Sequence, residues 1–312
     1  MYDYHAYNLL IRSDISLPEL AAGTSGLAAG NAPDVVVRIG TIDFPRDPPG
    51  ALGFAVSGSP EDACFYWEEL GAYRVTAGRT ITIDPTPGAD TQALRLPLLG
   101  MVIGMLLRQR GLFVLHSSAV AMKGGAALFI GNRGYGKSTI AAALHARGHD
   151  LLSDDWVAIQ WNAGVPYVLP AFPRLKLWPD SAASLGNDLD DLPRLATHIE
   201  KRNVAATSRF SSKAVPLRCI YVLGRAAVPH IHVLPPQQVI LELVRNSLLA
   251  FVGREMLPAG GADDLRQSGE LLKQVPVHGL QRSLSFEFLE ITTALVSRHF
   301  CDLPVFGKNL KA

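Results

Sequence analysis

The sequence has little cysteine, almost no net charge and no apolar run long enough to cross a membrane. Its 312 residues include only three cysteines, Cys64, Cys219 and Cys301, whose spacing fits neither a disulfide framework nor a zinc site. Their rarity suits a reducing compartment. We therefore expect the three thiols to be buried as small apolar side chains.

Lys and Arg number 29 against 28 Asp and Glu, which gives a formal net charge of +1. Such a chain has no long-range field for nucleic acid or for an anionic membrane. The apolar stretch 96–107 is well short of the roughly 20 residues that span a bilayer, so a buried helix explains it better. The N-terminus lacks the pattern of a signal peptide. We expect a cytoplasmic protein with no nucleic-acid or membrane partner; a homo-oligomer stays open.

The length suggests one large and one smaller domain. Residues 1–90 contain short β-like runs between Gly, Pro and Asp clusters, and predict a small β-rich lobe; the runs are 7–12, 35–39, 73–77 and 80–83. Residues 91–110 have helical periodicity and are expected to join this lobe to a second domain, 91–312. A polar segment, 181–215, is the candidate for a mobile lid.

A strand, loop, helix and strand follow one another in the second domain. Residues 113–120 and 126–130 predict strands and 138–145 a helix. Leu151 and Leu152 then precede Ser153-Asp154-Asp155, and a further strand follows to Gln160. Later, 217–223 and 230–234 predict strands, while 236–251 and 260–274 predict helices. This order is typical of a nucleotide-binding α/β core.

The loop in that core matches the phosphate-binding pattern G-x-x-x-x-G-K-[ST]. It consists of Gly131, Asn132, Arg133, Gly134, Tyr135, Gly136, Lys137, Ser138 and Thr139. Glycines let several backbone N–H groups face one anion, and the following helix adds its positive end. We expect Lys137 to reach the β and γ phosphates and Ser138 to ligate Mg²⁺. A dinucleotide-binding fold is disfavoured, since no G-x-G-x-x-G is present.

Two adjacent carboxylates, Asp154 and Asp155, come 17 and 18 residues after Lys137. They are interpreted as closing a buried strand beside the loop, where one could hold Mg²⁺ and the other could accept a proton. A solvated turn or a helix cap is the alternative. The apolar residues on both sides favour a position in buried structure and hence a functional pair.

From His116 through Ile159 the residues resemble the core of HPr kinase/phosphorylase. The resemblance rests on His116 placed 21 residues before Lys137, the loop 131–139, Arg147-Gly148-His149 after the helix, and the paired aspartates. It implies an α/β P-loop kinase core, similar to that of phosphoenolpyruvate carboxykinase, that phosphorylates a serine with ATP and Mg²⁺. It further implies Asp154 as the base, Asp155 as a magnesium or supporting carboxylate, and His116 as a residue lining the site.

Beyond this core the resemblance weakens. Residues 172–178, Phe-Pro-Arg-Leu-Lys-Leu-Trp, replace an acidic and glycine-rich segment of the enzymes that act on HPr. The layout is more similar to HPr-kinase-related proteins of bacterial peptide gene clusters, some of which phosphorylate a serine of a lasso-peptide precursor. The expected partner is thus a peptide or protein bearing a serine. Kinase and phosphorylase activity toward HPr itself, or a non-catalytic nucleotide-binding regulatory module, are the alternatives.

The acceptor, the phosphoryl donor and the reverse reaction stay open at this point. So do the roles of four basic residues after the core, Arg174, Lys176, Lys201 and Arg202, which could steady phosphate oxygens or lie in ordinary surface positions. His145 and His149, four residues apart, are not expected to bind a metal because the sequence offers no third ligand.

Overall fold

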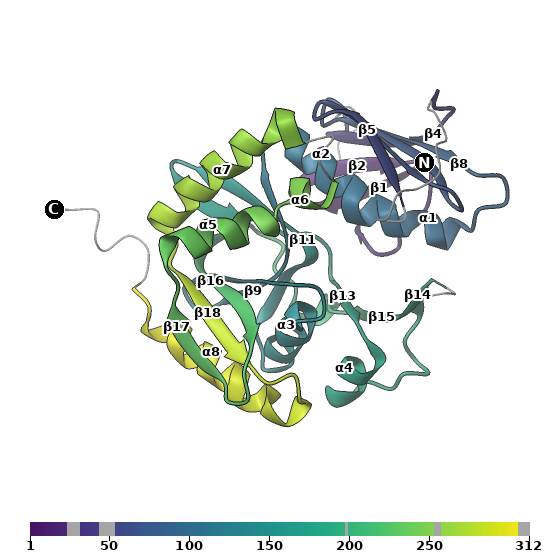
Figure 1. The fold of residues 1–312 in the computed structure, drawn as a ribbon. Coiled ribbons are helices and arrows are strands. Elements are labelled where there is room, and N and C mark those ends of the chain that lie inside the picture. The colour runs from purple at the N-terminus through teal and green to yellow at the C-terminus, as the bar shows by residue number, and fades with distance from the viewer. Residues whose placement is uncertain (24–31, 44–53, 197–198, 253–256, 305–312) are drawn as a thin grey trace. The chain divides into compact units, whose positions relative to one another are not determined.

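The computed structural model describes residues 1–23, 32–43, 54–196, 199–252 and 257–304 (Figure 1). The chain divides into two compact units, which are described separately. Unit 1 comprises Met1–Val114 with Ser247–Asp264, and unit 2 comprises Leu115–Asn246 with Leu265–Ala312. This division groups residues 91–109 with the N-terminal strands, and the domain boundary expected near residue 90 stays a prediction.

Unit 1 is built on an eight-stranded sheet in the order β3-β1-β2-β4-β8-β7-β6-β5. Its strands are β1 (Tyr2–Ala6), β2 (Leu9–Ser13), β3 (Ala21–Ala22), β4 (Val35–Ile39), β5 (Ala55–Ser59), β6 (Asp62–Trp67), β7 (Gly71–Thr76) and β8 (Thr80–Pro85). The four predicted β runs fall on β2, β4, β7 and β8. The sequence reading missed β1, β3, β5 and β6.

The helix expected over residues 91–110 is present in three pieces. These are α1 (Thr91–Pro97), a π-helical turn η1 (Leu98–Val102) and α2 (Ile103–Gln109), and the backbone of Gly100 within η1 is not helical. Leu98, Val102 and Leu106 are almost fully buried, which confirms a buried helical segment. Helices α6 (Leu248–Val252) and the first part of α7 (Leu257–Gln274) complete unit 1. Within the described residues, no helix has the length and apolarity to cross a membrane.

Unit 2 contains a seven-stranded sheet in the order β10-β9-β11-β12-β16-β18-β17, with β10 also paired to β16. The strands are β9 (Phe113–Met122), β10 (Gly125–Ile130), β11 (Asp150–Asn162), β12 (Val165–Val168), β16 (Val215–Arg225), β17 (His230–Val233) and β18 (Val277–Arg282). Because β10 pairs with both β9 and β16, five strands form a closed circuit. Strands β10, β16 and β18 are parallel, so their carboxyl ends lie at one edge.

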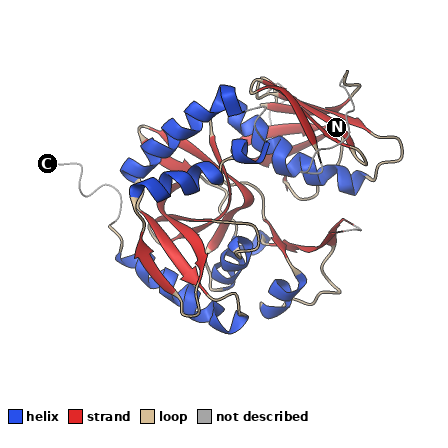
Figure 2. Ribbon diagram, viewed as in Figure 1, coloured by secondary structure: helices blue, strands red, loops and turns tan. Residues whose placement is uncertain are grey.

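A small sheet, β13-β15-β14, lies in the same unit and is formed by β13 (Arg174–Leu177), β15 (Ile199–Ala205) and β14 (Arg194–Ala196). The helices are α3 (Lys137–Ala146), α4 (Pro179–Ser184), α5 (Pro236–Arg245), α8 (Leu289–Asp302) and the end of α7, with 3-10 turns η2 (Thr207–Arg209) and η3 (Phe286–Phe288). Helix α3 packs against α8 (Figures 1 and 2).

One apolar core supports the loop that follows β10. It includes Phe129 at the end of β10, Ile140 and Leu144 of α3, and Tyr221 of β16, all buried. The rings of Phe129 and Tyr221 stack with centroids 5.5 Å apart. Strand β10 and helix α3, which flank the loop, are therefore fixed by the same packing.

The structure corrects two sequence expectations. Asp154 and Asp155 do not end a strand: they lie inside the 13-residue strand β11, which lies between β9 and β12 in the sheet. Cys64 and Cys219 are buried as expected, but Cys301 is exposed, since it lies on α8 next to the inward-facing Phe300.

The polar segment 181–215 contains regular structure. Helix α4 and strands β14 and β15 lie in it, and the buried side chains Ala182 and Val204 join the core of unit 2. Its proposed role as a lid stays a prediction.

Candidate functional site

The predicted phosphate loop connects β10 directly to the N-terminus of α3. Gly131, Gly134 and Gly136 all have positive φ, at 146°, 82° and 82°, which L residues with side chains rarely adopt. Helix α3 begins after Gly136 with no side-chain cap. The first N–H groups of a helix have no partner within it, so this end is suited to bind an anion.

Lys137 folds back over the loop that precedes it. Its Nζ donates to the carbonyl oxygens of Gly131, at 2.8 Å, and Asn132, at 3.4 Å. Burial lowers the pKa of Lys137 to about 8, opposed by the nearby carboxylates of Asp154 and Asp155. The ammonium group is therefore positioned at the loop and close to losing its proton at neutral pH.

Asp155 has a strained backbone, with φ of 87° inside a strand. Positive φ is unfavourable for a residue with a side chain and is retained mainly where the surrounding structure requires it. Among described non-glycine residues with positive φ, Asp155 alone lies within a strand; the others, Tyr7, Asn8, Ala77 and Ala163, lie at turns. The strain favours a functional role for this part of β11.

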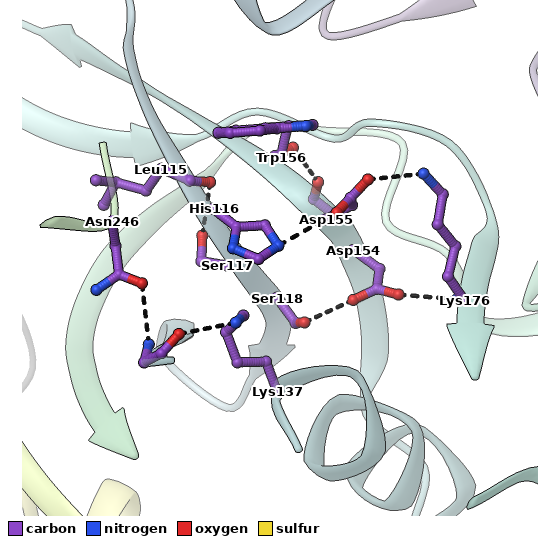
Figure 3. A network of polar contacts seen from close by, with 12 residues as sticks. Leu115, His116, Ser117, Ser118, Lys137, Asp154, Asp155, Trp156, Lys176 and Asn246 are labelled. Atoms are coloured by element: carbon purple, nitrogen blue, oxygen red, sulfur yellow. Dashed lines mark hydrogen bonds and ion pairs between the residues drawn. The ribbon is translucent and has the colours of Figure 1, made fainter. Parts of the chain in front are cut away.

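Different groups contact the two carboxylates (Figure 3). Asp154 is buried; its Oδ1 accepts a hydrogen bond of 2.6 Å from the hydroxyl of Ser118, and its Oδ2 accepts one of 2.9 Å from the backbone N–H of Lys176. Asp155 is partly exposed. Its Oδ2 lies 2.7 Å from Nζ of Lys176, and its Oδ1 lies 3.4 Å from Nε2 of His116.

The charge balance at Asp155 follows from these partners. Burial by itself raises the pKa of a carboxyl group, but the positive charge of Lys176 and the contact with His116 outweigh it and hold the pKa of Asp155 well below its usual range. These contacts favour the ionised form of Asp155, and Lys176 is its main counter-ion.

His116, Lys137, Asp154 and Asp155, predicted from the sequence, lie in one polar network of unit 2, as Figure 3 shows. The ring of His116 also contacts the ring of Trp156, with centroids 5.4 Å apart. Among the other predicted loop residues, 132–134 are exposed, Tyr135, Gly136 and Ser138 are half-buried, and Thr139 is buried.

Sequence reasoning missed two residues that hold this network together. Asn246, at the end of α5, accepts a hydrogen bond from the N–H of His116 with its carbonyl oxygen, at 2.7 Å, and one from the N–H of Gly131 with Oδ1, at 3.3 Å. Ser118 orients Asp154. Asn246 lies 115 positions from Gly131, so no local pattern indicates it, whereas Ser118 follows His116 by two residues on the same face of β9.

The four basic residues left open by the sequence have different positions. Lys176 binds Asp155, as described. Nζ of Lys201 lies over the exposed ring of Trp178, 5.6 Å from its centroid. Arg174 and Arg202 lie on β13 and β15 of the small sheet. The sequence left the role of Lys176 open and did not predict its carboxylate partner.

The described residues contain no cluster of three or more His, Cys, Asp or Glu side chains able to hold a metal ion. Magnesium does not need such a cluster, because it is commonly bound through one or two carboxylates, waters and the phosphates of the substrate. The partly exposed carboxylate of Asp155 and the hydroxyl of Ser138 are oxygen donors of the kind Mg²⁺ prefers. The donor set therefore fits a nucleotide-bound magnesium ion.

Comparisons with known proteins give only a distant likeness. No protein-family model and no curated protein matches the chain. Among solved structures, the HPr(Ser) kinase/phosphatase from Coxiella burnetii is similar over 60% of this chain and 95% of that chain, with 12% sequence identity and a TM-score of 0.32. The chain is a mixed α/β protein with several sheets, and no residue role is taken from that likeness.

Proposed function

We propose that this chain is a P-loop kinase that transfers the γ-phosphoryl group of ATP to a serine hydroxyl of a peptide or small protein. One observation carries the proposal: a phosphate-binding loop with its lysine and a pair of partnered carboxylates lie in a single network of one unit (Figure 3). Phosphoryl transfer depends mainly on such positioning and charge neutralisation.

In the proposed reaction the loop N–H groups and Lys137 bind the β and γ phosphates. The serine oxygen forms a bond to the γ phosphorus as the bond to the bridging oxygen of ADP breaks, and the serine proton passes to Asp154. Ser118 and the backbone of Lys176 fix the orientation of that carboxylate. A magnesium ion held by Ser138 and Asp155 would neutralise phosphate charge.

Asp154 is proposed as the base instead of Asp155 because of their partners. Lys176 and His116 contact the two carboxylate oxygens of Asp155 and hold the pKa of this group low, which makes it a poor proton acceptor. The hydrogen bonds to Asp154 come from a hydroxyl and a peptide N–H, which leave lone pairs free to accept a proton.

The acceptor class to test first is a lasso-peptide precursor, which the sequence resemblance implies. The purified chain is incubated with Mg-ATP and serine-containing precursor peptides, and the products are analysed by mass spectrometry for an added phosphate. HPr is included as a second acceptor, and a Lys137→Met variant as the inactive control. Lys123→Met, at an exposed lysine, is the matched control.

Phosphate on a peptide serine, absent with Lys137→Met and retained with Lys123→Met, is the expected result. Phosphate found on HPr and on none of the precursor peptides would assign HPr as the acceptor in place of a precursor peptide. Binding of Mg-ATP without transfer to any serine would contradict a kinase and favour a regulatory nucleotide-binding module.

A further inference from the structure

Two arginines lie at the same edge of the sheet as the phosphate loop. Strands β16 and β18 run parallel beside β10 and end in Arg225 and Arg282, which are aligned with each other in the sheet. The guanidinium of Arg225 lies over the ring of Tyr135 in the loop, 4.7 Å from its centroid. Arg282 lies against Gly136, the loop residue that follows Tyr135.

Arg282 is the largest of the fully buried side chains in the described structure, with an exposed fraction of 1%. Its Nε donates to the carbonyl oxygen of Ser283 at 3.0 Å. Within the described residues its Nη1 has no hydrogen-bond partner. Burial lowers the pKa of Arg282, and no carboxylate of the described residues opposes that effect. A guanidinium keeps its proton even when buried, so this is a buried positive charge without a counter-ion.

Nη1 of Arg282 lies against the phosphate loop. A Cβ atom added to Gly136 would lie 2.6 Å from Nη1 of Arg282, closer than real Cβ contacts allow. Gly136 immediately precedes Lys137 and the first N–H groups of α3. The unpaired charge is thus placed behind the part of the loop that would surround a bound phosphate.

We propose that Arg282 is a phosphate-site cation: its unpaired guanidinium, packed against Gly136, supplies positive charge that the phosphates of a bound nucleotide compensate. The inference rests on the proposed function and adds to it a residue that no sequence motif indicates. Burying an unpaired charge destabilises the free protein, and that cost is offset when an anion binds nearby.

This role predicts opposite effects on stability and on binding. Arg282→Met removes the buried charge but keeps most of the apolar side chain, so the melting temperature of the free protein should rise. The affinity for Mg-ATP and the affinity for inorganic pyrophosphate should each fall by about tenfold. Arg282→Lys keeps a charge without the planar fork and should recover part of that affinity. A residue needed only for folding would lower both stability and affinity.

Arg218 of β16 provides a matched control. It is also buried, but its guanidinium donates to the carbonyl oxygens of Lys123, Leu303 and Pro304. Arg218→Met removes these hydrogen bonds and should lower the melting temperature without changing the dissociation constants by more than about twofold, since the partners lie outside the loop.

The test measures the melting temperature and the binding of Mg-ATP and pyrophosphate for the wild-type chain and the three variants. Higher stability with weaker binding of both ligands in Arg282→Met, and partial recovery in Arg282→Lys, supports the proposal. Wild-type binding with unchanged affinity in Arg282→Met overturns the proposal alone. A wild-type chain that binds neither ligand overturns it together with the proposed function.

Discussion

Nζ of Lys176 lies 2.7 Å from Oδ2 of Asp155, while the backbone N–H of the same lysine donates to Oδ2 of Asp154. One residue of β13 therefore contacts both members of the aspartate pair. It neutralises one carboxylate through its side chain and orients the other through its backbone. The ion pair is partly buried, with 16% of the Lys176 side chain and 28% of the Asp155 side chain exposed, so solvent screens it only in part.

Lys176→Met should raise the pKa of Asp155 toward its usual value. Burial favours the neutral carboxyl, and with the ammonium group removed only His116 opposes it. A lowered pKa in the folded state gives stability that is present above the unfolded value of about 3.9 and lost as pH falls through the folded value. In the variant this stability should be missing at neutral pH, and the difference from wild type should shrink as pH falls below about 4. Urea unfolding at pH 7 and at about pH 3 measures it.

The matched control is Lys273→Met. Lys273 pairs with Glu270 at 2.9 Å on an exposed face of α7. An equal loss of stability at pH 7 in both variants would contradict the importance of the Lys176 pair.

The affinity for nucleotide should fall as pH rises above about 8. Burial lowers the pKa of Lys137 to about 8, and bound phosphates would restore its protonated form. Binding near pH 8 should therefore take up about half a proton, and the dissociation constant should increase up to about tenfold per pH unit above that point. Titration calorimetry in buffers of different ionisation enthalpy measures the uptake.

Lys137→Arg keeps the charge at all these pH values and should abolish the proton uptake and the pH dependence. The stability of the free wild-type protein should increase between about pH 8 and 10.5, where the unfolded lysine is protonated and the folded one is not. Proton uptake that persists in Lys137→Met would show that another group titrates.

Gly136→Ala should weaken nucleotide binding more than Gly134→Ala. Both glycines have φ of 82°, so alanine costs a similar backbone strain of roughly 1–2 kcal/mol at each. The two positions differ in the room available for a side chain, because a Cβ at Gly134 meets no atom within 4 Å, whereas a Cβ at Gly136 meets Arg282. The difference in dissociation constant between the two variants measures that contact. Equal losses would contradict it.

The parts of the site that the sequence predicted depend on local order along the chain. Glycines at fixed offsets, an apolar strand before them and a helix after them specify the loop, and Lys137 comes with that pattern. His116 came from the family resemblance and from its spacing to the loop. Strands β9, β10, β16 and β17 and helices α3 and α5 were predicted because their apolar periodicity is strong, whereas β14, β15, β18 and α8 were not predicted.

The remaining parts depend on contacts between distant residues. Asn246 and Arg282 reach the loop from the end of α5 and the end of β18, and only the strand order brings these ends beside it. The positive φ of Asp155 is equally absent from any pattern, since an apolar run on both sides predicts an ordinary strand. The apolar residues on both sides of the pair were also the reason for the mistaken prediction that the aspartates lie at the end of a strand.

The most direct test of the account is the activity of Asp154→Asn. Asparagine preserves the shape of the side chain but cannot accept the serine proton, so transfer to a serine peptide should fall by about 10² to 10⁴. The dissociation constant for Mg-ATP should stay within about threefold of wild type, because the carboxylate is not part of the phosphate loop. Asp150→Asn, at an exposed position of the same strand, should keep full activity. Unchanged turnover in Asp154→Asn would contradict the proposed site.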